Sequence, residues 1–159
     1  MALKITSINC KGLRDKGKRD IIFERCRQTG TDILFLQESH IVNKKEINVW
    51  NSEWGGPGFW SFGTQHSRGV GIVVHKNLCY KLVNFQHDFE GRLLKLDIDV
   101  GDCKFRLLNI YCPNNEKDRV DFLDNLYVHL STSRKIVLGG DFNPFMPRYG
   151  MSRSKNRPF

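Results

Sequence analysis

The chain has 159 residues, a net charge of +8 and a pI of about 9.4, and 40% of its residues are hydrophobic. This length is typical of one domain with a single core. The hydrophobic content and a mean hydropathy of −0.43 exclude a disordered chain and a membrane-embedded protein. The positive charge favours a polyanionic partner, nucleic acid first and an acidic membrane second.

The N-terminus and the cysteines indicate the compartment. The opening stretch MALKITSINC reaches Lys4 without an apolar segment, so we predict no secretory signal. The five cysteines include no C-x-x-C pair, which favours free thiols in a reducing environment over disulfides or a zinc site. No apolar run approaches the ~18 residues of a membrane span. We therefore expect an intracellular protein, nuclear or cytoplasmic, that is not secreted and has no membrane partner.

The first third of the chain predicts a strand, a helix and a second strand. The strand over 3–8 ends in the loop NCKG, and a helix over 18–28 follows, with Gly30 placed to end it. The motif DILFLQE predicts a continuous buried strand over 33–36 that finishes at a glutamine and a glutamate.

The middle of the chain predicts a turn region and then strands. The stretch VWNSEWGGPGFWSFG is rich in tryptophan and glycine, and its aromatic rings either cover a sheet or stack on unpaired bases. A buried strand follows over 69–74. Apolar residues alternate with charged ones over 92–100, Gly101 and Asp102 form a two-residue turn, and the partner strand returns to residue 111.

A helix and a last strand complete the pattern. Asn115 is a suitable N-cap, and the predicted apolar stripe of the helix consists of Val120, Leu123, Tyr127 and Leu130. The strand over 135–141 follows. Strands mixed with helices and hairpins predict an α/β or α+β fold with helices packed on its sheets.

Polar side chains stand where four of the predicted strands end, namely at Asn9, at Glu38, at Tyr111 with Asn114, and at Asp141 with Asn143. Open α/β sheets place ligands at the carboxyl ends of strands. We therefore expect these side chains to form one site.

The chemistry of such a site follows from its members. Glu38 and Asp141 offer hard oxygen ligands and Asn9 a neutral one, the set that Mg²⁺ prefers, with Mn²⁺ as the alternative. Strand alternation directs Asp141 and Asn143 to the same side, so that a carboxylate can activate water while an amide holds an oxygen. Taken singly, each of these residues also fits an ordinary turn or a solvated strand end.

Five motifs in this order and spacing, INCKG, FLQESH, RGVGIVV, LLNIYCPNN and LGGDFNP, resemble the exonuclease–endonuclease–phosphatase superfamily. The likeness is strongest to the apurinic/apyrimidinic-like endonuclease domain of non-long-terminal-repeat retrotransposons. It implies a four-layered α/β sandwich and Mg²⁺-dependent cleavage of a phosphodiester bond in DNA.

The resemblance also implies roles for single residues. Asn9 and Glu38 match residues around the metal, and Tyr111 matches a tyrosine that contacts the scissile phosphate. Asp141 matches the residue that orients or activates water, and Asn143 its phosphate-positioning companion. Weaker candidates for contacts with phosphate or nucleic acid are Asn114, Arg68, His40 and Lys11.

The C-terminal part departs from the family pattern. The closing Ser-Asp-His motif is absent, because all five histidines precede Asp141. We therefore expect residues 1–146 to form a partial domain, incomplete at its C-terminus, and residues 147–159 to form a basic, disordered tail. Such a chain is expected to have reduced or lost activity.

The predicted function is thus a metal-dependent DNA endonuclease of retrotransposon origin, without an obligate protein partner. Two alternatives remain open. One is a non-catalytic relic that binds nucleic acid, and the other is a phosphatase on the same fold.

Overall fold

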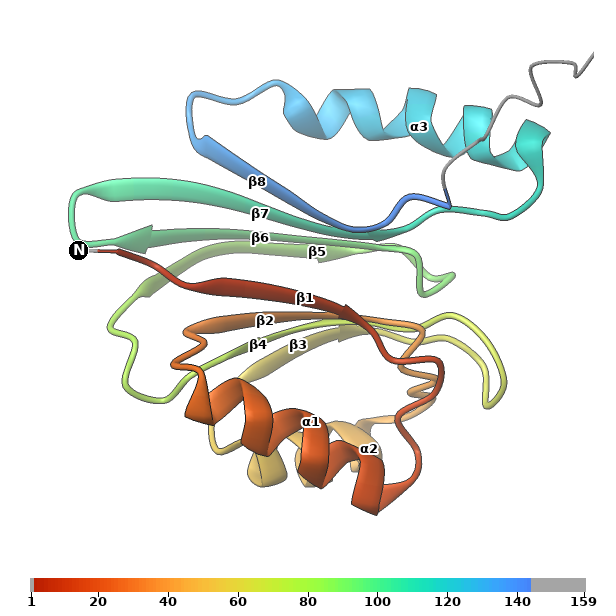
Figure 1. Ribbon diagram of the computed structural model, residues 1–159. Helices are drawn as coiled ribbons and strands as arrows, with labels where there is room; N and C mark the ends of the chain where they lie inside the picture. The colour runs from red at the N-terminus through yellow and green to blue at the C-terminus, as the bar shows by residue number, and fades with distance from the viewer. Residues whose placement is uncertain (1, 144–159) are drawn as a thin grey trace, which may run out of the picture.

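The computed structural model describes residues 2–143, which form two four-stranded sheets packed face to face between outer helices (Figure 1). The helix–sheet–sheet–helix order is the predicted four-layered sandwich, so the expected α/β fold class is confirmed. The predicted boundary at residue 146 and the basic segment 147–159 lie outside the described residues.

The first sheet has the strand order β1-β2-β4-β3 and consists of β1 (Ile5–Asn9), β2 (Ile33–Gln37), β4 (Val70–Val74) and β3 (Gly58–Ser61). β1 pairs in parallel with β2, while β4 is antiparallel to both of its neighbours. Every residue of β2 and β4 is buried, because helices cover one face of the sheet and the second sheet covers the other.

The second sheet has the order β5-β6-β7-β8 and consists of β5 (Lys81–His87), β6 (Leu93–Val100), β7 (Cys103–Tyr111) and β8 (Lys135–Asp141). β6 and β7 form the predicted hairpin, and Val100 pairs with Cys103 across its two-residue turn. β8 adds to β7 in parallel.

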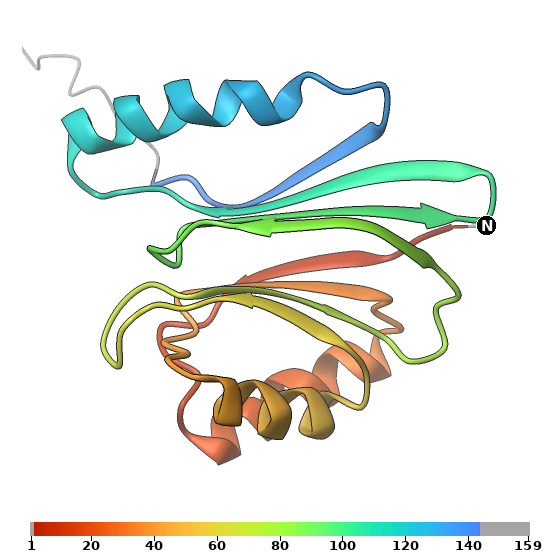
Figure 2. The same cartoon turned by 180° about the vertical axis from the view of Figure 1, so that it is seen from behind.

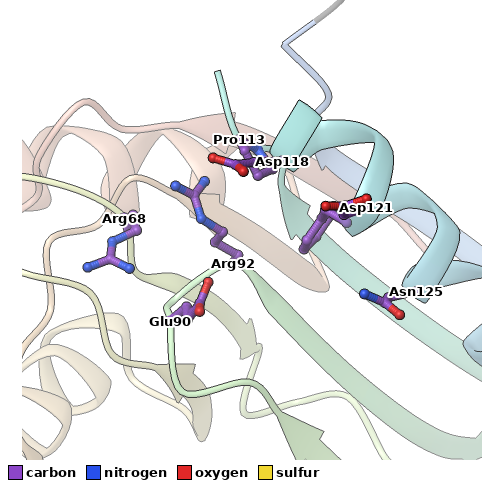
Figure 3. Close-up of a pocket in the computed structure, with 8 residues that line it drawn as sticks. Arg68, Glu90, Arg92, Pro113, Asp118, Asp121 and Asn125 are labelled. Atoms are coloured by element: carbon purple, nitrogen blue, oxygen red, sulfur yellow. The ribbon is translucent and has the colours of Figure 1, made fainter. Parts of the chain in front are cut away.

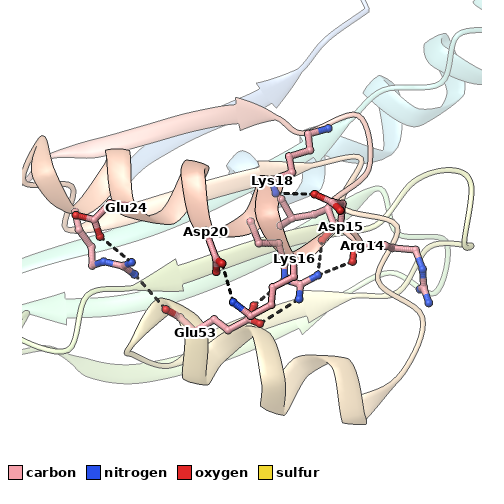
Figure 4. Close-up of polar contacts among 10 residues, drawn as sticks. Arg14, Asp15, Lys16, Lys18, Asp20, Glu24 and Glu53 are labelled. Carbon is pink, nitrogen blue, oxygen red and sulfur yellow. Dashed lines mark hydrogen bonds and ion pairs between the residues drawn. The ribbon is translucent and has the colours of Figure 1, made fainter.

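Helices α1 (Lys16–Gln28) and α2 (Lys44–Trp54) lie on the outer face of the first sheet (Figures 1 and 2). Asp15 caps α1 by accepting a hydrogen bond from the backbone of Lys18 (Figure 4). The buried Arg19 forms a 2.7 Å ion pair with Glu53 of α2. Its two-pronged geometry fixes the two helices relative to each other.

Three elements of the structure were not predicted, namely α2, β3 and β5. The predicted turn region over VWNSEW is helical instead, because Asn43 caps its start and the left-handed Gly55 ends it. The tryptophans Trp50, Trp54 and Trp60 are buried in the core between the first sheet and its helices. Of the two predicted alternatives, their rings therefore cover the sheet and are not exposed to stack on bases.

Helix α3 (Glu116–Leu130) lies on the second sheet and begins at the predicted cap Asn115. Its predicted apolar stripe is wrong for most of its members. Val120, Leu123 and Tyr127 are exposed, while Leu126 and Phe122 pack against the sheet. Apolar residues on α3 form two neighbouring faces. The spacing predicted one of them, whereas the face with Phe122 and Leu126 packs against the sheet.

The five cysteines all lie among the described residues and are free, as predicted. Within residues 2–143, no helix is long and apolar enough to cross a membrane.

Candidate active site at the strand ends

The carboxyl ends of four strands meet at one end of the sandwich. Asn9 ends β1 beside Gln37, the last residue of β2, and Tyr111 ends β7 beside Asp141, the last residue of β8. Glu38 directly follows β2. The two pairs belong to different sheets, so the site forms only because the sheets pack face to face.

Asn9, Glu38 and Asp141 are in direct contact. The Nδ2 atom of Asn9 donates to Oε1 of Glu38 at 3.0 Å and to Oδ2 of Asp141 at 2.6 Å. One amide nitrogen therefore joins two carboxylates that are far apart in sequence. The Oδ1 atom of Asn9 accepts a hydrogen bond from the backbone N–H of Lys11 at 3.0 Å, which fixes the orientation of the amide.

The loops that carry these residues have unusual backbone conformations. Glu38, His40, Lys11 and Arg68 have φ angles of 49°, 62°, 48° and 61°, in the left-handed region. Non-glycine residues there are uncommon, and such strain is concentrated at functional sites. The turn directly after β2 directs Glu38 toward Asn9 instead of continuing the strand.

Asn109 of β7 forms a buried polar bridge between the sheets below the site. Its Nδ2 atom donates to the carbonyl oxygens of Leu36 at 3.0 Å and Gly71 at 2.7 Å, and its Oδ1 atom accepts from Nε2 of Gln37 at 2.8 Å. The same Gln37 atom donates to Ser7 of β1 at 3.1 Å. Asn109 and Gln37 were not predicted as site residues, although Asn109 interrupts the apolar motif LLNIY and Gln37 directly follows the apolar run of β2.

Tyr111 is buried beside the carboxylates. Burial raises the pKa of its phenol to about 12, and the hydrogen bond to Glu38 adds to the shift. The guanidinium of Arg92 lies over the tyrosine ring, 5.3 Å from its centroid, and donates to the Tyr111 carbonyl oxygen at 3.3 Å. The phenol therefore stays protonated at neutral pH and can donate a hydrogen bond.

Asn143 reaches Asp141 through a different geometry from the predicted one. β8 ends at Asp141, and Asn143 has a φ of 42°, so strand alternation does not extend to it. Its backbone N–H donates to Oδ1 of Asp141 at 2.9 Å, and its side chain donates to the Cys112 carbonyl oxygen at 2.6 Å. Both oxygens of the Asp141 carboxylate are thus held, one by Asn9 and the other by Asn143.

The two glycines before Asp141 contact the protein itself. A side chain at Gly139 would lie 2.8 Å from the ring of Phe35, and one at Gly140 would lie 2.1 Å from the carbonyl oxygen of Ile110. The glycines therefore allow β8 to lie close to β2 and β7, which brings Asp141 to the site.

The weaker candidates lie around this centre. Lys11 and Asn114 are exposed, the latter in the loop between β7 and α3. Arg68 lines a pocket with Arg92 (Figure 3). The ring of His40 packs against Gly12, and its buried Nε2 atom has no hydrogen-bond partner among the described residues. Burial lowers the pKa of His40, which favours its neutral form.

The donor set fits a magnesium ion better than a softer metal. Residues 2–143 contain no group of three or more His, Cys, Asp or Glu side chains that could hold a metal ion. They do bring the carboxylates of Glu38 and Asp141 to one amide nitrogen of Asn9, while the amide oxygen accepts from the Lys11 backbone, so the available oxygen ligands are the two carboxylates. Mg²⁺ is usually held by one or two carboxylates, with waters and substrate phosphates as the other ligands.

Comparison with known proteins places this arrangement in a family. The sequence pattern described as "Endonuclease/Exonuclease/phosphatase family" matches residues 6–157. The chain belongs to this family. The resemblance inferred from the five motifs is thereby confirmed for the endonuclease/exonuclease/phosphatase family.

A transposon-encoded relative supports the retrotransposon likeness. The chain is 30% identical over 146 residues to the Transposon TX1 uncharacterized 149 kDa protein of Xenopus laevis, across 90% of this chain and 11% of that protein. This chain therefore spans about a tenth of that relative's length.

Solved structures share the fold at lower identity. An AP endonuclease from Archaeoglobus fulgidus matches with a TM-score of 0.70 and 22% identity, across 89% of this chain and 58% of that one. D. rerio TDP2, complexed with single strand DNA product, matches with a TM-score of 0.66 and 18% identity, across 90% and 61%. The chain therefore spans about three fifths of the length of these two structures.

Proposed function

We propose that this chain is a divalent-metal-dependent phosphodiesterase that cuts DNA, with its site at Asn9, Glu38, Tyr111, Asp141 and Asn143. The observation that carries the proposal is the bridge from one asparagine amide to two carboxylates. The AP endonuclease and the DNA-bound TDP2 that share the fold support nucleic acid as the substrate class. The net charge of +8 is consistent with a phosphate-rich partner.

The metal would be held by Glu38, beside Asn9, with Mg²⁺ favoured and Mn²⁺ as the alternative. When bound, such an ion supplies Lewis-acid polarisation of a phosphoryl oxygen. Asn9 keeps the two carboxylates together against their mutual repulsion, because its amide N–H groups donate to both.

The remaining residues would act on water and on the phosphate. Asp141 orients the attacking water and accepts its proton, since both of its oxygens are already fixed in place. The phenolic hydrogen of Tyr111 is bonded to Glu38 in this structure and would turn to a phosphate oxygen when the substrate binds. Asn143 fixes Asp141 through its backbone N–H, and its side-chain amide, which donates to the Cys112 carbonyl oxygen in this structure, would turn to the phosphate when the substrate binds.

The test is plasmid nicking with Mg²⁺ by wild type and by Glu38→Gln and Asp141→Asn. We expect each substitution to lower the nicking rate by roughly 10²–10⁴-fold, the range for a positioned acid–base group. Glu24→Gln is the matched control, because Glu24 is exposed on α1 and pairs only with neighbouring residues of that helix. Equal nicking by wild type and Glu38→Gln would contradict the metal assignment.

The second candidate is a protein that binds nucleic acid without cutting it, which the net charge of +8 favours. It predicts retention of DNA that falls steeply with salt. It also predicts no nicking by wild type at any Mg²⁺ or Mn²⁺ concentration, which separates it from the nuclease.

A further inference from the structure

A groove runs between α3 and the turn 88–92 that joins β5 to β6, next to the candidate active site. It consists of two cavities of about 460 Å³ each, which share Glu90, Phe122 and Asn125 as lining residues. We call it the turn–helix groove. Arg68 and Arg92 line one end, and His129 of α3 lines the other.

The side chain of Phe89 is presented at this groove almost entirely in solvent. It is 94% exposed, so its burial contributes almost nothing to the stability of the fold. Its ring centroid lies 5.5 Å from that of His87 in an edge-to-face arrangement. The pair offers a partly ordered aromatic surface at the entrance of the groove.

The turn that carries Phe89 is held firmly. The carboxylate of Asp88 accepts hydrogen bonds from the backbone N–H of Arg92, at 3.1 Å for each oxygen, and from Ser61 at 2.7 Å. Gly91 has a φ of 70°, and a side chain there would lie 2.6 Å from Phe62 and Gly69 backbone atoms. The exposure of Phe89 is therefore built into a rigid turn and is not the result of a loose loop.

Positive and negative side chains are mixed in the cavity beside the candidate site (Figure 3). Arg68 and Arg92 line it, and Arg92 lies over the ring of Tyr111. The carboxylates of Glu90 and Asp118 lie near these arginines, and Asp121 lies farther along α3. These carboxylates repel a phosphate but accept hydrogen bonds from amino groups.

We propose that the turn–helix groove binds an unpaired nucleobase that carries an exocyclic amino group, next to the phosphate that Tyr111 would contact. The base stacks on Phe89, and its amino group donates to a carboxylate of the groove, as cytosine N4 does to Asp or Glu. A paired base stays stacked between its neighbours in the duplex, so its face is not available to the ring of Phe89. The proposal rests on the proposed function, and it adds a preference for DNA with an unpaired base beside the cleaved bond.

The experiment measures fluorescence anisotropy of labelled duplexes in EDTA, which prevents metal-dependent cleavage. One duplex is fully paired, and others carry a single bulged cytosine or thymine. We expect wild type to bind the cytosine bulge about tenfold more tightly than the paired duplex. Phe89→Ala should lower the affinity for the cytosine bulge by roughly 5- to 10-fold, to that of the paired duplex, and leave binding of the paired duplex within twofold.

Two further variants sharpen the result. Asp121→Ala should reduce the preference for cytosine over thymine, because the carboxylate acceptor for the amino group is lost. Tyr127→Ala is the control, since Tyr127 is an aromatic residue of α3 that is 75% exposed and does not line the groove. Phe89 and Tyr127 make few contacts, so we expect both variants to fold.

The inference is overturned if wild type does not prefer the cytosine bulge, or if Phe89→Ala keeps the preference. Nicking activity separates this result from the proposed function. If wild type shows no bulge preference but nicks plasmid in a manner that depends on Glu38, the nucleobase site in the groove is rejected and the nuclease proposal stands. A retained bulge preference without any nicking rejects only the nuclease.

Discussion

The outer faces of the two sheets are covered by helices to different extents. On the first sheet, α1 and α2 bury Phe23, Trp50 and Trp54, and an internal ion pair joins the helices. On the second sheet, α3 buries Leu126 alone among its residues, and the edge strand β5 is exposed along nearly its whole length. Large apolar side chains of α3 face solvent instead.

This difference shows where the stability of the site originates. Asn9 and Glu38 come from the well-covered first sheet, and Tyr111 and Asp141 come from the less covered second sheet. The second pair is held in place by the core between the sheets and by Asn109, and only to a small extent by α3. We therefore expect substitutions in α1 and α2, and in the polar bridge through Asn109, to affect the site more than substitutions on α3.

The largest effect is expected at Trp54. Its ring packs edge-to-face on Phe23 at 5.5 Å, and its Nε1 atom donates to the Val74 carbonyl oxygen at 3.0 Å. Trp54→Ala should lower the free energy of unfolding by about 3–5 kcal/mol, measured by urea denaturation. The matched substitution Tyr127→Ala on α3 should change it by less than about 0.5 kcal/mol.

A loss at Tyr127 as large as the loss at Trp54 would contradict the comparison. It would mean that the outer face of α3 is covered in solution to the same degree as that of α2.

A smaller loss of stability, together with a loss of nicking, is expected for Asn109→Ala. The change leaves the Leu36 and Gly71 carbonyl oxygens and the Gln37 amide without their buried partner. We expect a total loss of about 1–3 kcal/mol, the cost of leaving a buried group unsatisfied, since the Gln37 amide keeps its hydrogen bond to Ser7. The exposed Asn48 of α2 provides the control variant Asn48→Ala, which should keep wild-type stability and nicking. Normal nicking by Asn109→Ala would show that the sheets keep the site assembled without this bridge.

The smallest effect is a loss of stability in alkaline solution. Burial raises the pKa of Cys10 to about 12 and that of Cys112 to about 11, from 9.0, and that of Tyr111 to about 12, from 10.0. The fold favours the protonated forms. Their contribution is therefore complete below pH 9 and is lost as the pH rises from 9 toward 12.

Urea denaturation at pH 8, 9.5 and 10.5 tests this dependence in wild type, Cys112→Ala and Cys79→Ala. Removal of the buried thiol should flatten the alkaline decline, whereas removal of Cys79, which is exposed, should leave it unchanged. Identical pH profiles for the three proteins would show that Cys112 does not titrate differently in the folded state.

Local sequence patterns determined much of the fold. The alternation over 92–100 with its glycine turn fixed the β6–β7 hairpin, and capping residues fixed the start of α3. The apolar runs of β2 and β4 indicated strands covered on both faces. Such features depend on neighbours in the chain, so a single sequence expresses them. α2 was missed because its tryptophans and the following glycines have the composition of a turn, whereas the caps Asn43 and Gly55 define a helix.

The residue types at the strand ends, and the family motifs that contain them, also came from the sequence alone. The tertiary structure decided how they meet: the contact from Asn9 to both carboxylates, the bridge through Asn109, and the position of Arg92 over Tyr111. It also decided which face of α3 is buried. These features join side chains from different sheets or layers, and their distances depend on how the layers pack, which no local pattern specifies.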